Sequence, residues 1–349
     1  MKIAIIFGGI STEHDVSVIS GMSVIKNLNK SKYKIVPIYI DKKGQWYKYT
    51  KDIDEIEVME IGIEPKELEK IENIIEDLKK VDVIFPVLHG IGGEDGSIQG
   101  LFKLINKPFV GCGILASSIG MDKVYTKIIF EKAKILQTRY IYIKKEKNKY
   151  KYIHQNLNDE ELDLIEICKK IESDIQYPIF VKPSNSGSSV GINKAENIDE
   201  LRKAIEYATI YDNKILIEKG IIGREVECAV LGNDEIIASS VGEIIPADKF
   251  YSFDAKYNNS ESKTIIPANI NEKLSDKIRS IAKKAFKAID GKGFARVDFF
   301  IEKETNEIYL NEINTIPGFT SISMYPKLME NIGIKYEELL DRLIELALE

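Results

Sequence analysis

Cysteine is scarce in this sequence, and long hydrophobic runs are absent. Only three of the 349 residues are cysteine, Cys112, Cys168 and Cys228, and they lie far apart in apolar surroundings. An odd number of widely spaced cysteines does not suit a disulfide framework or a zinc site, so we expect buried thiols in a reducing compartment. No segment reaches the roughly 20 apolar residues of a membrane span, and the N-terminal MKIAIIFGG lacks the long apolar segment of a secretion signal. These absences predict a cytoplasmic protein.

Positive charge is not in excess either. Lysine and arginine number 49 against 55 aspartate and glutamate residues, which gives a net charge of -6 at pH 7. A general affinity for nucleic acid or for anionic membranes is therefore not expected. Any anionic substrate has to be bound by a local group of Lys and Arg side chains.

Two common nucleotide-binding motifs are missing or incomplete. The Walker A pattern GxxxxGK[ST] does not occur, because the only Gly-Lys pair, Gly291-Lys292, is followed by Gly293. Gly111, Gly113 and Ala116 formally match a dinucleotide fingerprint, but no suitable acidic residue follows on a second strand. A dinucleotide-dependent oxidoreductase is thus the weaker interpretation, and cofactor absorbance of the purified protein would reveal it.

The sequence does contain an alternation of short apolar runs and amphipathic segments. A buried-type strand over residues 2–7 leads through Gly8-Gly9 into a helix, and further strands are predicted at 34–40 and 81–87, with a helix at about 65–79 between them. This alternation predicts an α/β protein that begins with a parallel sheet. With 44% hydrophobic residues in a chain of this length, two or three domains are expected.

A hairpin near the C-terminus carries the strongest candidate site. Two strand-like runs, 295–301 and 307–313, are separated by a polar linker. Because side chains alternate along a strand, Asp298 shares a face with its neighbours at spacing two, as do Glu312 and Asn314 on the second run. If the two faces coincide, the three side chains form an all-oxygen cluster suited to Mg²⁺. The alternative is that each acid merely faces solvent, as most acids do.

Other stretches have the composition of ligand-binding segments. Lys182 precedes the Gly/Ser loop, residues 183–191, whose small donor-rich residues suit a triphosphate, although a flexible hairpin has a similar composition. His89 precedes four glycines between 90 and 96 and is either structural or part of a site. Glu13, at the start of the first helix, is either a capping acid or a ligand for a charged group. Residues 240–267, rich in aromatics, predict a compact loop folded over a site.

The order of these motifs resembles one enzyme family. GGISTEHDVS, LHGIGGEDGSIQG, MDK, VKPSNSGSSVG, FYSFDAKY, RVDFF and NEINTIPGFTSIS follow one another as in the D-alanine:D-alanine ligase family, and the resemblance covers essentially the whole chain. It implies an ATP-grasp fold preceded by a Rossmann-like N-terminal domain with a parallel sheet. The implied domains are 1–118, 119–211 and 212–349.

The resemblance also implies roles for individual residues. The residues that match ATP-binding positions are Lys123, Lys182, Ser186, Gly187, Ser189, Glu218, Lys219 and Glu225. Two Mg²⁺ ions, which Mn²⁺ can replace, are expected on Asp298, Glu312 and Asn314. The positions expected to take part in catalysis are Glu13, Ser188, Tyr257, Arg296 and Gly318, and those near the two D-alanines are His89, Ser323, Lys256 and Tyr251.

The activity implied by the resemblance is the ATP-dependent joining of two D-alanines through an acyl phosphate, with release of ADP and phosphate, for peptidoglycan precursors. D-Alanine and ATP are the expected partners, in a homodimer without nucleic acid or membrane. D-Serine as second substrate is the nearest alternative. A different ATP-grasp ligase and a non-catalytic ATP-grasp binding protein are more remote, because neither would need all of the motif residues.

Overall fold

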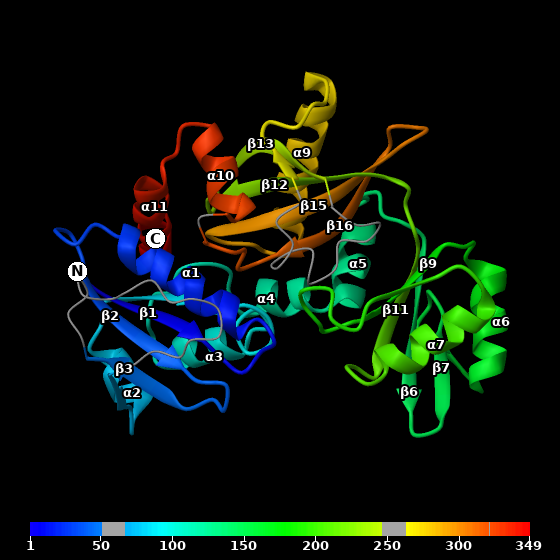
Figure 1. Cartoon of the computed structure of the whole chain (residues 1–349), viewed down its shortest axis with the longest axis horizontal. Helices are drawn as coiled ribbons and strands as arrows, with labels where there is room; N and C mark the ends of the chain where they lie inside the picture. Colours follow the sequence, from blue (N-terminus) through cyan, green and yellow to red (C-terminus); the bar gives the residue numbers. More distant parts are fainter. Residues whose placement is uncertain (51–66, 246–262, 321) are drawn as a thin grey trace.

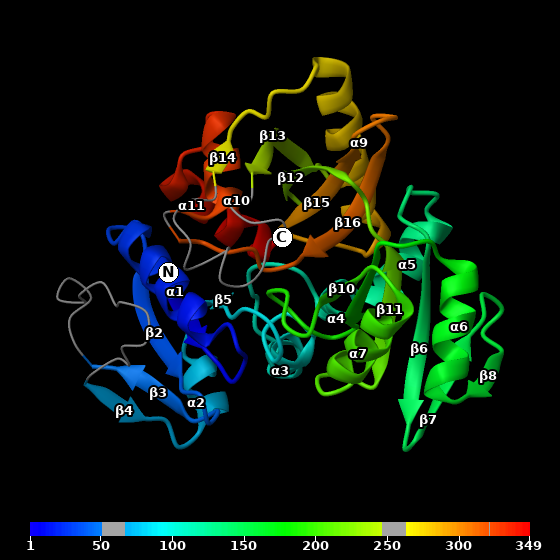
Figure 2. The same cartoon turned by 45° about the vertical axis from the view of Figure 1, so that its right-hand side comes forward.

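The computed structural model describes residues 1–50, 67–245, 263–320 and 322–349. Three β-sheets define three parts of the molecule, which Figures 1 and 2 show from two directions. The first sheet lies at the lower left of Figure 1, the second at the right and the third at the top. Among the described helices, none has the length and apolar character needed to cross a lipid bilayer.

The first sheet, in the order β4-β3-β2-β1-β5, is parallel at its centre. β1 pairs in parallel with β2 and β5, as the strand and helix alternation predicts, whereas β3 and β4 add antiparallel strands at one edge. Its strands are β1 (Lys2–Gly8), β2 (Lys34–Ile40), β3 (Trp46–Tyr49), β4 (Leu68–Lys70) and β5 (Val83–Val87), and its helices are α1 (His14–Asn27), α2 (Ile74–Lys79), α3 (Ser97–Leu104) and α4 (Ile114–Met121).

The helix predicted at about 65–79 is shorter than expected. In its described part, Leu68–Lys70 form the edge strand β4, and the helix begins only at Ile74. The side chain of Asn73 accepts a hydrogen bond from the N–H of Glu76, which caps the helix at this point. Leu68 and Ile71 stand at helical spacing, but the pairing of Leu68–Lys70 with β3 decides their conformation.

The second sheet, in the order β10-β9-β11-β6-β7-β8, is antiparallel throughout its described pairs. Helix α5 (Lys123–Lys132) precedes this sheet in the chain. Helices α6 and α7 pack against each other, and this part of the molecule has its own hydrophobic core. Its elements are β6 (Tyr140–Glu146), β7 (Lys149–Ile153), β8 (Asp159–Leu162), α6 (Leu164–Asp174), β9 (Ile179–Pro183), β10 (Asn193–Ala195), α7 (Ile198–Ala208) and β11 (Lys214–Lys219).

The third sheet, in the order β14-β13-β12-β15-β16, contains the predicted hairpin as β15 and β16. Helix α9 packs on β12, β13 and β15, and α10 packs on β12 and β13. Its elements are β12 (Gly223–Leu231), β13 (Ile237–Ile245), β14 (Lys263–Ile265), α9 (Glu272–Ala288), β15 (Phe294–Glu302), β16 (Ile308–Asn314), α10 (Met324–Asn331) and α11 (Tyr336–Leu348).

One hydrophobic core joins the first sheet to the C-terminal helices. Helix α11 packs against α1 and β5, and the core contains Phe7 and Phe85 from the first sheet together with Phe319, Leu340 and Leu343. Figure 1 shows α11 directly above α1. The first and last parts of the chain are therefore joined by common packing, whereas the second sheet has a separate core.

The sheets suggest a division of the chain. β11 is hydrogen-bonded between β9 and β6 of the second sheet, whereas a boundary at 212 would assign it to the C-terminal part. We therefore propose that the second unit extends to Lys219 and that the third begins with β12. The boundary near 118 remains a proposal, within helix α4.

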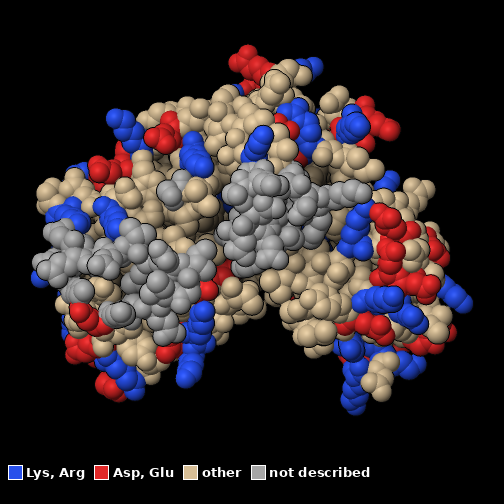
Figure 3. Space-filling model, viewed as in Figure 1, with Lys and Arg blue, Asp and Glu red and all other residues tan. Residues whose placement is uncertain are grey.

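The surface carries both signs of charge. In the view of Figure 3, acidic and basic side chains are intermixed, notably over the second-sheet part at the right. The lower edge of the molecule is hollowed between the first-sheet part and the second-sheet part in the same view. All three cysteines are buried and free, as predicted.

Candidate active site

A cleft of about 600 Å³ lies where the second and third sheets face each other. One side is formed by β9 and β11, which contribute Lys182 and Glu218. The other side is formed by β12 and β16, which contribute Glu225 and Glu312. The Gly/Ser loop also lines the cleft, so the structure brings together the residues predicted to bind ATP.

The buried carboxylate of Glu218 holds two lysines on this cleft. Lys127 Nζ lies 2.9 Å from Glu218 Oε2, and Lys182 makes an ion pair with Glu218 Oε1. Burial alone would raise the pKa of the Glu218 carboxyl, but the positive charges of Lys127 and Lys182 lower it to about 2. Glu218 is therefore ionised at neutral pH, and the two lysines that it binds line the cleft.

The Gly/Ser loop is fastened at its base to helix α5. Asp122 caps α5 by accepting hydrogen bonds from the N–H groups of Val124 and Tyr125. The same carboxylate accepts a hydrogen bond of 2.7 Å from Ser184 Oγ and pairs with Lys214. Further along the loop, Lys123 Nζ donates to the carbonyl of Ser186. The loop root is thus held by buried charge-assisted hydrogen bonds.

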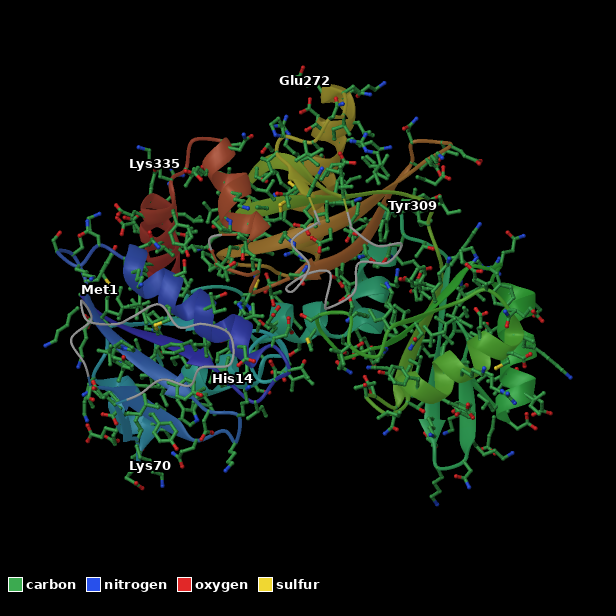
Figure 4. The ribbon with its side chains drawn as sticks, in the orientation of Figure 1. Met1, His14, Lys70, Glu272, Tyr309 and Lys335 are labelled. Atoms are coloured by element: carbon green, nitrogen blue, oxygen red, sulfur yellow. The ribbon has the colours of Figure 1, made fainter. Side chains whose placement is uncertain are left out.

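Glu13 lies where the first sheet's loop meets the Gly/Ser loop. Its side chain does not cap helix α1, so the capping interpretation is wrong; instead it accepts a hydrogen bond from Ser188 Oγ. A Cβ added to Gly90 or Gly187 would lie only 2.6 or 2.4 Å from Glu13 Oε2, so only glycine fits at either position without displacing the carboxylate. Figure 4 labels His14, the next residue, on the edge of the first-sheet part that faces the rest of the molecule.

The predicted hairpin has the predicted register. Arg296 is paired with Asn314, and Asp298 with Glu312, so the four polar side chains share one face. The Arg296 guanidinium binds Asp298 with Nε–Oδ1 and Nη2–Oδ2 distances of 2.8 and 2.7 Å, and Asn314 Nδ2 donates to Asp298 Oδ2 at 3.0 Å. Glu227 of β12 approaches Arg296 Nε at 3.1 Å. Despite the burial of Arg296, Asp298 and Glu227 raise its pKa well above the usual value.

The donor set fits Mg²⁺. Carboxylate and amide oxygens are hard ligands, and Glu312 and Asn314 line the cleft where phosphates would lie. Among the described residues no three His, Cys, Asp or Glu side chains are gathered as a metal cage. Mg²⁺ takes one or two protein carboxylates and completes its shell with water and substrate phosphates, and Glu312 and Asn314 offer oxygen ligands of this kind.

The Gly318 turn, residues 315–319, follows β16. Ser323 lies beside it, since a Cβ on Gly318 would meet Ser323 Oγ at 2.8 Å. Ser323 Oγ also lies 2.7 Å from Thr320 Oγ1. His89 is buried beneath this turn, with Nδ1 3.0 Å from the Ile316 carbonyl and Nε2 3.0 Å from Ser20 Oγ. Burial lowers its pKa and keeps the ring neutral.

Some predicted site residues lie outside the described part of the chain. These are Tyr251, Lys256 and Tyr257, in the segment expected to fold over the site. The strand β13 and the short β14 occupy the described ends of that segment. Lys219, whose carbonyl accepts a hydrogen bond from Thr138 Oγ1 at 2.6 Å, and Ser189 both line the cleft.

Sequence reasoning missed several residues of this site. Lys127, Glu94 and Glu227 have partners far away in the sequence, so no local pattern pointed to their contacts. The spacing of Lys123 and Lys127 on one helix face was a usable signal for a second cation. Glu94 stood within a glycine-rich stretch already singled out, and an acid among glycines at a strand end was the signal there.

Two sheets that hold a nucleotide-sized cleft between them, with buried lysines on one side and carboxylates on the other, characterise the ATP-grasp class of ATP-dependent ligases. The structure falls in that class. Residues 2–112 match the model of the D-ala D-ala ligase N-terminus, and residues 143–345 match that of the D-ala D-ala ligase C-terminus. The chain belongs to the D-Ala-D-Ala ligase family.

Individual relatives are similar over their full lengths. A D-alanine–D-alanine ligase from Acetivibrio thermocellus is 50% identical, covering 100% of this chain and 96% of the relative. Among solved structures, the VanG D-Ala:D-Ser ligase from Enterococcus faecalis has a TM-score of 0.84 at 38% identity and covers 99% of both chains. The D-alanine-D-alanine ligase from Coxiella burnetii has a TM-score of 0.80 at 32% identity, covering 99% of this chain and 93% of that one.

Proposed function

We propose that this protein joins two D-alanine molecules to D-alanyl-D-alanine at the expense of ATP, supplying a peptidoglycan precursor. The observation that carries the proposal is the position of Glu13. Its buried carboxylate reaches the Gly/Ser loop and lines the cleft together with Lys123 and Lys182. A negative charge at this point suits the ammonium group of an amino acid whose carboxylate faces the nucleotide phosphates.

The first step activates a poor electrophile. A carboxylate resists attack by an amine, so the γ-phosphate of ATP is transferred to the carboxylate of the first D-alanine, which gives an acyl phosphate and ADP. Lys123 and Lys182, released from Ser186 and Glu218, bind the phosphates and stabilise the charge that develops on them. Mg²⁺ held by Asp298, Glu312 and Asn314 would neutralise further phosphate charge.

The second step forms the peptide bond. The deprotonated amine of the second D-alanine attacks the acyl phosphate carbonyl, and phosphate leaves. Asp298 and Glu227 hold the Arg296 guanidinium in place. We assign Arg296 and the N–H of Gly318 to the stabilisation of the tetrahedral oxyanion, and one such donor typically lowers the activation free energy by about 3 kcal/mol. Ser323 beside Gly318 is assigned to the carboxylate of the second D-alanine.

The remaining assignments are part of the same proposal. Ser188 and Tyr257 would close the site over the first D-alanine and exclude water from the acyl phosphate. Lys256 would lie near the carboxylate of the second D-alanine and the transferred phosphate, and Tyr251 would contact the substrate. Glu225 and Lys219 would contact the ribose and adenine. We also propose a homodimer in the cytoplasm, where ATP is supplied.

Phosphate release from MgATP tests this function. The protein is supplied with D-alanine, L-alanine, D-serine or D-lactate, and the products are identified by mass. Release that depends on D-alanine and yields the dipeptide is the expected result. A protein that binds ATP but releases no phosphate with any of the D-compounds would contradict the substrate assignment while leaving the ATP-grasp fold intact.

Ligation of D-alanine to D-serine is the second candidate. The likeness to the VanG D-Ala:D-Ser ligase, at a TM-score of 0.84, favours it. Equimolar D-alanine and D-serine in one reaction separate the two candidates. A predominance of D-alanyl-D-alanine supports the first function, and a predominance of D-alanyl-D-serine supports the second.

A further inference from the structure

Both backbone polar groups of Ile316 are bound by side chains from the first sheet's part of the molecule. Glu94 Oε2 accepts a hydrogen bond of 3.3 Å from the Ile316 N–H, and His89 Nδ1 lies 3.0 Å from the Ile316 carbonyl oxygen. Glu94 Oε1 in turn accepts a hydrogen bond of 3.0 Å from the Gly90 N–H. One residue of the Gly318 turn therefore makes hydrogen bonds through both its N–H and its carbonyl group to residues more than 200 positions away in the sequence.

A third hydrogen bond binds the other end of the turn. Ser20 of helix α1 is buried, and its Oγ accepts a hydrogen bond of 3.3 Å from the Phe319 N–H. The same Oγ lies 3.0 Å from His89 Nε2. With the proton of the neutral ring on Nδ1, His89 donates to Ile316, and the Ser20 hydroxyl donates to Nε2, so every partner is satisfied.

Gly318 lies between the two bound residues. The turn from 315 to 319 is attached to β16 at one end, and its other end is bound by Ser20. Tyr336 of α11 adds a hydrogen bond of 2.7 Å to the Phe319 carbonyl. The direction of the Gly318 N–H consequently depends on contacts made at Ile316 and Phe319, not on contacts of Gly318 alone.

We propose that Ser20, His89 and Glu94, termed the Ile316 clamp, are positioning residues that hold the Gly318 N–H in the direction required for the tetrahedral oxyanion. The proposal rests on the proposed ligase function and assigns His89 to the turn, not to the substrate. The residues that line the described cleft include Glu94 and Gly90 but not His89, in keeping with this assignment. The clamp acts in the second chemical step, because phosphoryl transfer to the first D-alanine precedes formation of that oxyanion.

Amide hydrogen exchange tests the clamp without reference to catalysis. Ser20→Ala removes the acceptor of the Phe319 N–H, so exchange of the 315–320 segment is expected to accelerate about tenfold, as loss of one buried hydrogen bond allows. Ser17→Ala is the matched control. Ser17 is a buried serine of the same helix that accepts from the Gly8 N–H at 2.8 Å and donates to the Val87 carbonyl, so it stabilises the first sheet instead of the turn.

The ratio of phosphate released to dipeptide formed tests the effect on chemistry. The wild type is expected to release one phosphate per dipeptide. In Ser20→Ala, acyl phosphate still forms, but its attack by the second amine is slowed and water competes, so the ratio is expected to rise at least about twofold. Ser20→Thr, which keeps the hydroxyl, is expected to restore the wild-type ratio, and Ser17→Ala is expected to retain it.

The outcomes separate the clamp from the function. Unchanged exchange of 315–320 in Ser20→Ala, or an unchanged ratio in a variant that still turns over, would overturn the clamp. Dipeptide absent from the wild-type reaction would overturn the function, while the exchange measurement would still decide whether the clamp exists. If Ser20→Ala does not fold, Glu94→Ala serves instead, because it removes the acceptor of the Ile316 N–H. Its expected results are the same.

Discussion

Glu94 is an acid that the protein keeps uncharged near neutral pH. Burial and the negative charge of Glu13 raise the pKa of its carboxyl to about 8, although hydrogen bonds from Gly90 and Ile316 and the charge of Arg296 oppose the shift. A neutral acid next to an ionised Glu13 avoids repulsion between two carboxylates at the proposed amino acid site.

This shift makes part of the folding stability depend on pH. The folded state retains a proton between the usual pKa near 4.5 and the raised value near 8, whereas the unfolded chain releases it. The contribution of Glu94 is therefore complete below about pH 4.5 and is lost as the pH rises to 8, by up to about 1.4 kcal/mol per pH unit. We predict that Glu94→Gln abolishes this pH-dependent part of the folding stability.

Denaturant unfolding of both proteins at pH 5.5, 7 and 8.5 is the measurement. The stability of the wild type relative to Glu94→Gln is expected to fall steadily across the series. Parallel pH profiles for the two proteins would contradict the raised pKa.

Glu312 is the carboxylate among the two predicted metal ligands that line the cleft. Glu312→Gln replaces a charged ligand by a neutral one, so we predict that phosphate release falls at least about a hundredfold while thermal unfolding is unchanged. Initial rates over a range of Mg²⁺ concentrations provide the measurement.

Glu307→Gln is the matched control on the same hairpin. Glu307 is exposed and accepts a hydrogen bond from Tyr309, whose position Figure 4 labels at the far end of the hairpin region. The Glu307→Gln variant is expected to retain full activity. Wild-type rates in Glu312→Gln would remove the metal assignment.

At the scale of elements, the contact between the Gly/Ser loop and Glu13 requires a close approach of the loop backbone to the Glu13 carboxylate. A methyl group at Gly187 would lie 2.4 Å from Glu13 Oε2. We predict that Gly187→Ala displaces the carboxylate, breaks its hydrogen bond to Ser188 and raises the KM for the first D-alanine about tenfold, the typical cost of a hydrogen bond to a charged group.

Gly100→Ala is the control for this substitution. Gly100 lies in helix α3, where an added Cβ meets nothing within 4 Å. Alanine is expected to leave the kinetics unchanged and to stabilise the helix by about 0.5–1 kcal/mol. Equal KM values for D-alanine in Gly187→Ala and the wild type would show that the carboxylate does not bind the amino acid.

The elements differ in how far the sequence determines them. The hairpin β15–β16 was predictable because apolar alternation fixes which face each side chain occupies, and a slip of one residue would bury the charges. The start of α2 could not be predicted, because residues 67–72 lack such alternation and their conformation is set by pairing with β3. The clamp could not be predicted either, since its hydrogen bonds join residues of two separate motifs and of helix α1 that only the fold brings together.

For the whole molecule, helix α11 determines how the two ends of the chain are joined. Leu340 is fully buried in the core shared with the first sheet. We predict that Leu340→Ala lowers the free energy of unfolding by about 2–5 kcal/mol through lost burial and the cavity left behind. Urea unfolding monitored by circular dichroism provides the measurement.

Leu348→Ala, in the same helix but 46% exposed, is the matched control. It is expected to change the stability by less than about 0.5 kcal/mol. Equal destabilisation by the two substitutions would mean that α11 is not part of the common core.

The shared core also constrains how the protein is made. Strand β5 packs against α11, which the ribosome synthesises after every other described element. At the usual rate of translation, Phe85 of β5 stays without this packing for tens of seconds, on the order of the time needed to add the intervening residues. The nascent first sheet is therefore a natural client for chaperones until the end of the chain arrives to cover its beginning.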